Sequence, residues 1–242
     1  MSTARTTLMH QEAAEAGAAV ARQFAANADT VATLTDALRN QPPAFIATSA
    51  RGSSDHAATY GKHLFETLLG LATASVPPSV SSLYGARLRL DGALHLAISQ
   101  SGRSPDLLRQ AEAARAAGAR VVALVNDADS PLAALADTVL PLHAGPERSV
   151  AATKSYLCSL AALLQLAAHW SQDARLLAAL DHLPALLDEA FAQDWSSLAE
   201  GLADGRNLFV LGRGPGLGAA QEIALKLKET CGIHAEAFSS AE

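Results

Sequence analysis

The sequence predicts an α/β protein in which a parallel sheet is flanked by helices on both faces. Short apolar runs at 44–48, 93–98 and 119–125 alternate along the chain with segments of helical length. Strands joined through helices form right-handed βαβ units, and such strands run parallel in one sheet. The chain has 242 residues, of which 50% are hydrophobic, so it can bury the core of one large domain or two modest ones.

Two helices are predicted to precede this sheet within residues 1–40. A helical pattern starts at Leu8, Asn27 or Asp29 is suited to cap a second helix, and the proline pair at 42–43 ends it.

The further elements follow in order along the chain, and Gly118 stands just after the helix at 105–117, where glycine commonly ends a helix. The predicted strands are 44–48, 71–76, 93–98, 119–125 and 138–142, and the predicted helices are a segment ending near Leu69, then 105–117, 151–171 and 173–202. Pro184 is expected to kink or split the last of these helices.

Serine-rich turns follow two of the predicted strands. Residues 49–54 follow the first strand and residues 99–104 follow the third, and Pro105 opens a helix after the second turn. Ligands bind at the carboxyl ends of parallel strands, and backbone N–H groups at a helix N-terminus suit a phosphate. The simpler interpretation is that Ser104 is an N-cap with Pro105 at the first helical position. A single serine can serve both purposes.

A second αβ segment is predicted near the end of the chain, with a strand at 207–211 and a helix at 216–231. Its turn repeats the spacing of the first one, because Arg-Gly followed by four residues and Ala-Ala occurs at 51–58 and again at 213–220. We therefore expect a tandem repeat whose second copy is incomplete in this chain. The expected division is N-terminal helices at 1–40, a first domain at 41–175, and a linking helix with the start of a second domain at 176–242.

The helix at 216–231 carries a narrow stripe of charge. Glu222, Lys226 and Glu229 share one face, while apolar and small residues flank them. A solvated face with a Glu–Lys pair is one interpretation, and an acid–base stripe lining a crevice is the other. The stretch at 147–155 is also unusual, although it could be only a helix start with Ser149 or Thr153 as cap and Lys154 in solvent.

Composition argues against several other classes of protein. The net charge is −6 and Lys and Arg do not cluster, so we expect no nucleic-acid partner. A secretory signal and a membrane-spanning run are not predicted, and the two cysteines are expected to be buried free thiols, which fits the cytoplasm. We expect no metal site, because the eight histidines follow no ligand spacing. The glycines at 212–218 do not fit a dinucleotide fingerprint, and no motif for a nucleophilic serine occurs.

Four segments together resemble the sugar isomerase (SIS) family. They are SARGSSDHA at 49–57, SQSGRSPDL at 99–107, ERSVAATKS at 147–155 and ALKLKETCGIHAEAFSSAE at 224–242. Within that family the chain is similar to the isomerase half of glucosamine-6-phosphate synthase and to SIS-type glucosamine-6-phosphate deaminases. The resemblance implies tandem SIS domains, no cofactor, and a homodimer that builds its site at the dimer interface. Relatives continue beyond such a segment into a ring-opening histidine and a functional carboxyl tail, so it also implies that the second domain is truncated here.

The resemblance also implies roles for individual residues. Ser99, Gln100, Ser101 and Ser104 would hold the sugar phosphate, Ser53 and Ser54 would lie near the ligand, and Val150 would contact the sugar through its backbone. Glu229 would move a proton between C1 and C2, with Lys226 and Glu222 as supporting neighbours.

The activity implied is an aldose–ketose isomerisation with deamination of glucosamine 6-phosphate to fructose 6-phosphate and ammonia. Galactosamine 6-phosphate and a fructosamine phosphate are alternative substrates. A regulatory module that binds a sugar phosphate without catalysis is a second class of function. A truncated product whose fold survives only as an oligomer is a third.

Overall fold

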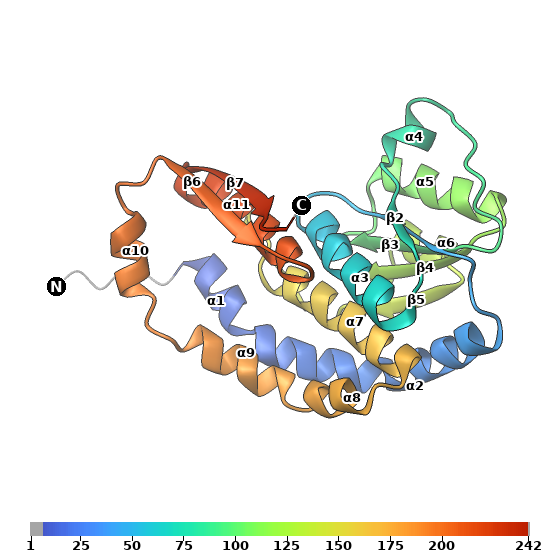
Figure 1. Ribbon diagram of the computed structural model, residues 1–242, viewed down its shortest axis with the longest axis horizontal. Coiled ribbons are helices and arrows are strands. Elements are labelled where there is room, and N and C mark those ends of the chain that lie inside the picture. The colour runs from blue at the N-terminus through green and yellow to red at the C-terminus, as the bar shows by residue number, and fades with distance from the viewer. Residues whose placement is uncertain (1–6, 242) are drawn as a thin grey trace.

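The computed structural model describes residues 7–241, in which a five-stranded parallel sheet lies between two layers of helices (Figure 1). The strand order is β2-β1-β3-β4-β5, so β1 and β3 are neighbours near the middle of the sheet. The predicted parallel α/β fold is therefore confirmed. The strands are β1 (Ile46–Ser49), β2 (Thr73–Ser75), β3 (Leu94–Ser99), β4 (Arg120–Val125) and β5 (Thr138–Pro141).

Alternate residues of the strands pack into two different cores. Leu94, Leu96 and Ile98 of β3 point toward one layer, which is formed by α2 (Ala16–Asn40), α3 (Ser53–Leu69) and α7 (Lys154–Ser171). Ala97 points to the opposite layer, where α5 (Pro105–Ala116) and α6 (Pro131–Leu135) lie. Burial on both faces explains why these strands read as continuous apolar runs in the sequence. A short helix, α4 (Ser79–Ser82), packs beside α5.

The N-terminal helices divide at a different residue from the one predicted. α1 (Leu8–Ala14) is followed by a turn at Glu15, and α2 then runs unbroken through Asn27 and Asp29. Asn27 does not cap a helix because its side chain is used elsewhere: its Nδ2 donates to the carbonyl oxygen of Pro141, 2.8 Å away. This bond ties the middle of α2 to the end of β5.

The segment at 173–202 contains three short helices in place of the single one predicted. They are α8 (Ala174–Leu180), α9 (Leu183–Phe191) and α10 (Ser196–Leu202), and α9 packs along α2. Pro184 lies in the first turn of α9. The prediction that this proline splits the helical segment, the alternative to a kink, is therefore confirmed. A second break at 192–195 was not predicted.

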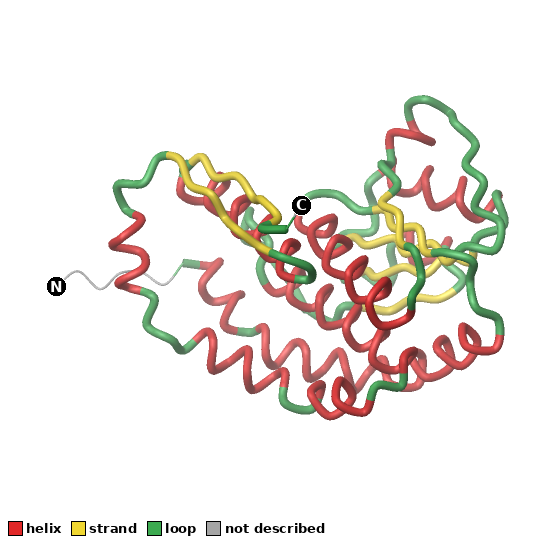
Figure 2. Tube along the Cα trace, in the orientation of Figure 1, coloured by secondary structure: helices red, strands yellow, loops and turns green. Residues whose placement is uncertain are grey.

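A second, smaller βαβ unit follows, formed by β6 (Asn207–Gly212), α11 (Gly216–Cys231) and β7 (His234–Ser239) (Figures 1 and 2). The strand after α11, β7, pairs in parallel with β6 over six residues. The unit repeats the local geometry of β1–α3–β2, because Gly52 and Gly214 have φ of 56° and 55° in the two turns. Gly70 and Gly232 likewise end the two helices in the left-handed conformation. The two units therefore share the same local geometry at these turns and helix ends.

The two helices of these repeated units, α3 and α11, pack directly on each other. Gly218 permits the contact, since a Cβ atom there would lie 2.5 Å from the carbonyl oxygen of His56. Tyr156 of α7 adds a hydrogen bond from its hydroxyl to the carbonyl oxygen of Gly218, at 3.2 Å. The helix that carries the charged stripe is therefore held against the first domain.

The cysteines differ from each other in environment. Cys158 is fully buried in α7, as predicted, and burial raises the pKa of its thiol to about 12. The expectation of burial is wrong for Cys231, which lies at the end of α11, where residues 228–231 are all exposed. Both are free thiols. None of the helices within residues 7–241 is both long and apolar enough to cross a membrane.

We expect the stability of the fold to depend on pH, because one histidine is buried in the sheet. His95 of β3 is fully buried, its Nε2 lies 2.9 Å from the Ser49 hydroxyl, and desolvation lowers its pKa to about 4. Below pH 6.5 His95 binds a proton in the unfolded chain, whereas in the folded chain it stays neutral until the pH approaches 4. The contribution of neutral His95 to the free energy of unfolding is therefore present above pH 6.5 and is lost as the pH falls toward 4. Between pH 7 and pH 5 we expect the free energy of unfolding to fall by about 2 kcal/mol more in the wild type than in His95→Gln.

Urea unfolding of both proteins at the two pH values measures this difference, because the other titrating groups are shared and cancel. Equal losses of stability in the two proteins would show that His95 is not the group responsible.

Candidate functional site

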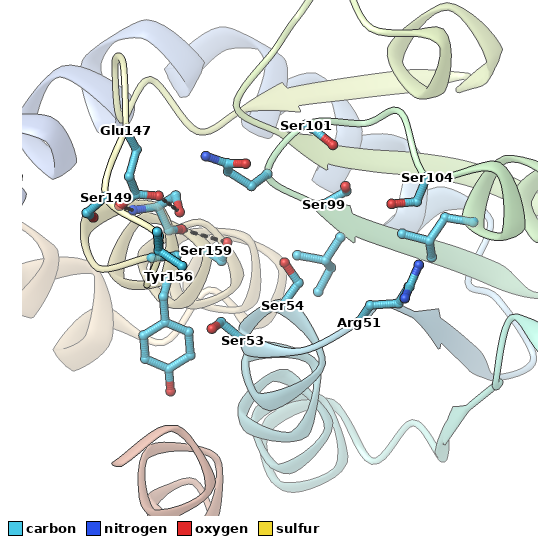
Figure 3. Close-up of a pocket in the computed structure, with 16 residues that line it drawn as sticks. Arg51, Ser53, Ser54, Ser99, Ser101, Ser104, Glu147, Ser149, Tyr156 and Ser159 are labelled. Atoms are coloured by element: carbon cyan, nitrogen blue, oxygen red, sulfur yellow. Dashed lines mark hydrogen bonds between the residues drawn. The ribbon is translucent and has the colours of Figure 1, made fainter. Parts of the chain in front are cut away.

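A pocket of about 370 Å³ opens at the carboxyl ends of β1 and β3. Serines dominate its wall, and they come from the turns after β1 and β3, from the segment before α7 and from α7 itself (Figure 3). Its lining residues are Arg51, Ser53, Ser54, Ile98, Ser99, Gln100, Ser101, Ser104, Leu107, Glu147, Ser149, Val150, Ala152, Ser155, Tyr156 and Ser159.

The turn after β3 forms one end of this pocket. Ser99 is nearly buried, and its Oγ accepts the N–H of Gly102 at 3.0 Å, which closes the turn. Gly102 has a φ of 63°, and a Cβ atom there would lie 2.2 Å from the Ser130 hydroxyl, so only glycine fits. Ser104 occupies the N-cap position of α5, but its hydroxyl lines the pocket instead of accepting a bond from the helix. The prediction that Ser104 is the N-cap and Pro105 the first helical residue is therefore confirmed, while the Ser104 hydroxyl makes no capping bond and is available to a ligand.

The turn after β1 supplies the adjacent wall. Ser53 and Ser54 begin α3, so the N-terminus of a 17-residue helix points at the pocket. Arg51 brings a guanidinium to the same end, where its Nη1 lies 3.4 Å from the Asp106 carboxylate. That side chain is 62% exposed, and an exposed pair at this distance is weak. Serine hydroxyls, helix N-termini and a cation together suit a phosphate.

The segment before α7 forms the opposite end of the pocket (Figure 3). Glu147 acts as the cap of α7: its Oε1 accepts the N–H groups of Thr153 and Ser155 at 2.9 and 3.2 Å, and its other oxygen accepts the Ser155 hydroxyl. Thr153 occupies the N-cap position of α7, as one of the alternatives held, but its side chain makes no capping hydrogen bond. The placement of Lys154 in solvent is wrong, since it is 1% exposed and pairs with Glu15.

The charged stripe of α11 lies beside the pocket and touches its wall. Lys226 Nζ donates to Ser53 Oγ at 3.3 Å and lies 2.8 Å from Glu229 Oε2 and 3.2 Å from Glu222 Oε1. The second oxygen of Glu222 is 2.8 Å from Nδ1 of His56 in α3. A continuous chain of polar contacts thus runs from His56 to Glu229, and Lys226 connects it to the pocket.

Burial and neighbouring charges shift the pKa values of Glu222 and Lys226 in opposite directions. Burial raises the pKa of Glu222, but hydrogen bonds from His56 and Ser53 and the charge of Lys226 outweigh it, so the pKa lies below its ordinary value. Burial lowers the pKa of Lys226, but Glu229 and Glu222 more than compensate, so this pKa is raised. Both groups are therefore charged near neutral pH. The alternative of a solvated stripe is wrong for Glu222, whose side chain is 8% exposed.

The structure brings most of the predicted site residues together. Ser53, Ser54, Ser99, Gln100, Ser101, Ser104 and Val150 all line the pocket. Glu222, Lys226 and Glu229 do not line it but lie in one chain of contacts from Ser53. Four further residues of the site were not predicted: Arg51, Glu147 and Tyr156 in the wall and His56 behind it. All of them except Tyr156 fall inside the segments that resemble the family. No group of three or more His, Cys, Asp or Glu side chains within residues 7–241 is arranged to hold a metal ion.

Comparison with known proteins identifies the family. The SIS domain model matches residues 42–169. Glutamine–fructose-6-phosphate aminotransferase (isomerizing) of Zymomonas mobilis is 36% identical over 208 residues, which cover 80% of this chain and 33% of that protein. The same enzyme of Thermococcus kodakarensis is 39% identical over 209 residues, covering 80% of this chain and 34% of that protein. The chain therefore spans about a third of the length of these curated relatives.

A solved structure agrees over nearly the whole chain. The crystal structure of a protein from Silicibacter pomeroyi, provisionally named a phosphosugar isomerase, is 50% identical and superposes with a TM-score of 0.94. The match covers 98% of this chain and 72% of that one. The family-model match and the similarity to these relatives lead to one conclusion: this chain belongs to the SIS domain family, whose members here are phosphosugar isomerases and the isomerase regions of aminotransferases.

Proposed function

We propose that this protein is an amino-sugar-phosphate isomerase and deaminase that converts glucosamine 6-phosphate to fructose 6-phosphate and ammonia. The observation that carries the proposal is the serine-lined pocket at the carboxyl ends of β1 and β3, joined through Ser53 to the charged stripe of α11. The names of the curated relatives include fructose 6-phosphate and isomerisation, which supports a six-carbon ketose phosphate as one of the ligands.

In this proposal the phosphate binds at the end of the pocket formed by the turns after β1 and β3. Hydroxyls of Ser99, Ser101 and Ser104 and the N-terminus of α3 would donate to its oxygens. Arg51 would add a positive charge once it turns from Asp106. A phosphate held far from the reacting carbons fixes their orientation and contributes binding energy to the reaction.

From this end the sugar would extend toward Val150 and Glu147, and the contact of Ser53 with Lys226 would connect its first carbons to α11. Glu229 would take the proton from C2 of the open-chain aldehyde while the oxygen on C1 gains a proton, which gives an enolamine. Return of a proton to C1 gives a ketimine at C2, and addition of water releases ammonia and leaves fructose 6-phosphate. Lys226 would hold the Glu229 carboxylate in place through its 2.8 Å contact.

An assay of both products tests this function directly. We expect the protein, given glucosamine 6-phosphate, to release ammonia and fructose 6-phosphate in equal amounts, each measured by a coupled enzymatic assay. Galactosamine 6-phosphate and a fructosamine phosphate, tested in parallel, decide which sugar is preferred. Tight binding of these sugar phosphates without turnover of any would contradict the proposal and favour a regulatory binding module.

A further inference from the structure

A carboxylate from the first helix reaches the sugar end of the pocket. Glu12 of α1 is 4% exposed, and it accepts hydrogen bonds from the backbone N–H groups of Arg148 and Ser149 and from the Ser149 hydroxyl. Its partners are 136 and 137 positions away in the sequence. Helix α1 lies outside residues 42–169, the part of the chain that matches the SIS domain model.

Glu12 is charged in spite of its burial. Burial raises the pKa of this carboxyl, but the bonds from Ser149 and Arg148 and the positive charge of Lys154 outweigh the burial and lower it. Hydrogen bonds to an ionised acceptor are about twice as strong as those between neutral groups. A buried carboxylate with these three donors therefore fixes the backbone at 148–149 firmly.

Two carboxylates anchor the segment 148–153 at its two ends. Glu12 holds Arg148 and Ser149, and Glu147 holds the N–H of Thr153. Between these anchors the side chain of Val150 is fully exposed, while Ser149, Val150 and Ala152 line the pocket. The shape of this wall thus depends on the backbone between the anchors, with only the small side chain of Ala151 buried beneath it.

We propose that Glu12 is a positioning residue that shapes the sugar end of the pocket, so that helix α1 contributes to recognition of the sugar but not of the phosphate. This inference rests on the proposed function, because it assumes that a sugar phosphate lies along the pocket. The phosphate end is formed by residues 51–54 and 99–104, which Glu12 does not contact in the described structure.

The affinities for two ligands, fructose 6-phosphate and inorganic phosphate, distinguish the sugar end of the pocket from the phosphate end. In Glu12→Gln, which keeps the shape and removes the charge, calorimetry should show a dissociation constant for fructose 6-phosphate about tenfold higher, while that for inorganic phosphate stays unchanged. Ser104→Ala, at the phosphate end, should raise the dissociation constants of both ligands. Glu112→Gln is the matched control, since Glu112 is exposed on α5 and the same change there should affect neither ligand.

Turnover gives a second measurement of the same role. We expect Glu12→Gln to raise KM for glucosamine 6-phosphate by a similar factor and to change kcat much less, because the reacting carboxylate lies elsewhere. A variant with a lower melting temperature but wild-type affinity for fructose 6-phosphate would mean that Glu12 only stabilises the fold, which would overturn the inference. Equal weakening of both ligands would overturn it too. Failure of the wild type to bind fructose 6-phosphate would instead refute the proposed function, and this inference with it.

Discussion

Replacing Glu229 by glutamine is expected to lower kcat for glucosamine 6-phosphate by about 10²- to 10⁴-fold, the usual contribution of a positioned general acid–base group. The amide keeps the size of the side chain and can still accept a hydrogen bond from Lys226, which lies 2.8 Å from Oε2 in the native protein. It cannot take up the proton from C2. The loss should therefore appear in kcat and not in the affinity for the sugar phosphate.

Two measurements make this expectation specific. Ammonia release gives kcat, and calorimetry with fructose 6-phosphate gives the affinity, which should stay within a factor of about two because the amide keeps the size of the side chain. Glu200→Gln is the control, since Glu200 is exposed on α10 and should have wild-type kcat. Ammonia release by Glu229→Gln at the wild-type rate would refute the assignment of Glu229.

Replacing Gly218 by alanine is expected to be the second large effect, of about 10²-fold on kcat, because small misplacements of reacting groups have effects of this size. The added methyl would lie 2.5 Å from the carbonyl oxygen of His56 and 3.1 Å from the backbone N of Tyr60. Backbone atoms cannot move aside as a flexible side chain can, so α11 must shift away from α3. That shift would disturb the contacts of Glu222 with His56 and of Lys226 with Ser53.

Gly216→Ala is the matched control on the same helix. A methyl there would meet no atom of the described residues within 4 Å, and alanine favours a helix over glycine by about 1 kcal/mol, so this variant should be as active and at least as stable as the wild type. Inorganic phosphate should bind both variants equally. Full activity of Gly218→Ala would show that the close contact of α3 and α11 is not needed for catalysis.

The sheet and the serine turns could be predicted because they depend on local patterns. Strands such as β3 and β4 are buried on both faces and read as apolar runs, and the turns that follow β1 and β3 must meet because parallel neighbours share one edge. Helix α11 was also predicted within its observed bounds, since Gly216 and Gly232 flank a clear amphipathic pattern.

Contacts between distant segments could not be predicted in this way. The sequence contains no signal that Glu12 meets Ser149, that His56 meets Glu222, or that the Asn27 side chain binds Pro141 and so leaves α2 unbroken. The exposure of Cys231 has the same origin, because an apolar helical face does not reveal where its partner helix ends. Tertiary packing decides such features.

Proton exchange in D₂O tests most directly whether this site moves a proton between C1 and C2 of a bound phosphosugar. The wild type is incubated with fructose 6-phosphate, and the C1 protons are followed by NMR, which requires neither ammonia nor a chosen amino sugar. We predict that one of the two C1 protons is replaced by deuterium in the wild type and that Glu229→Gln exchanges it at least about 10²-fold more slowly. Saturating binding of fructose 6-phosphate without exchange by the wild type would contradict this proton transfer.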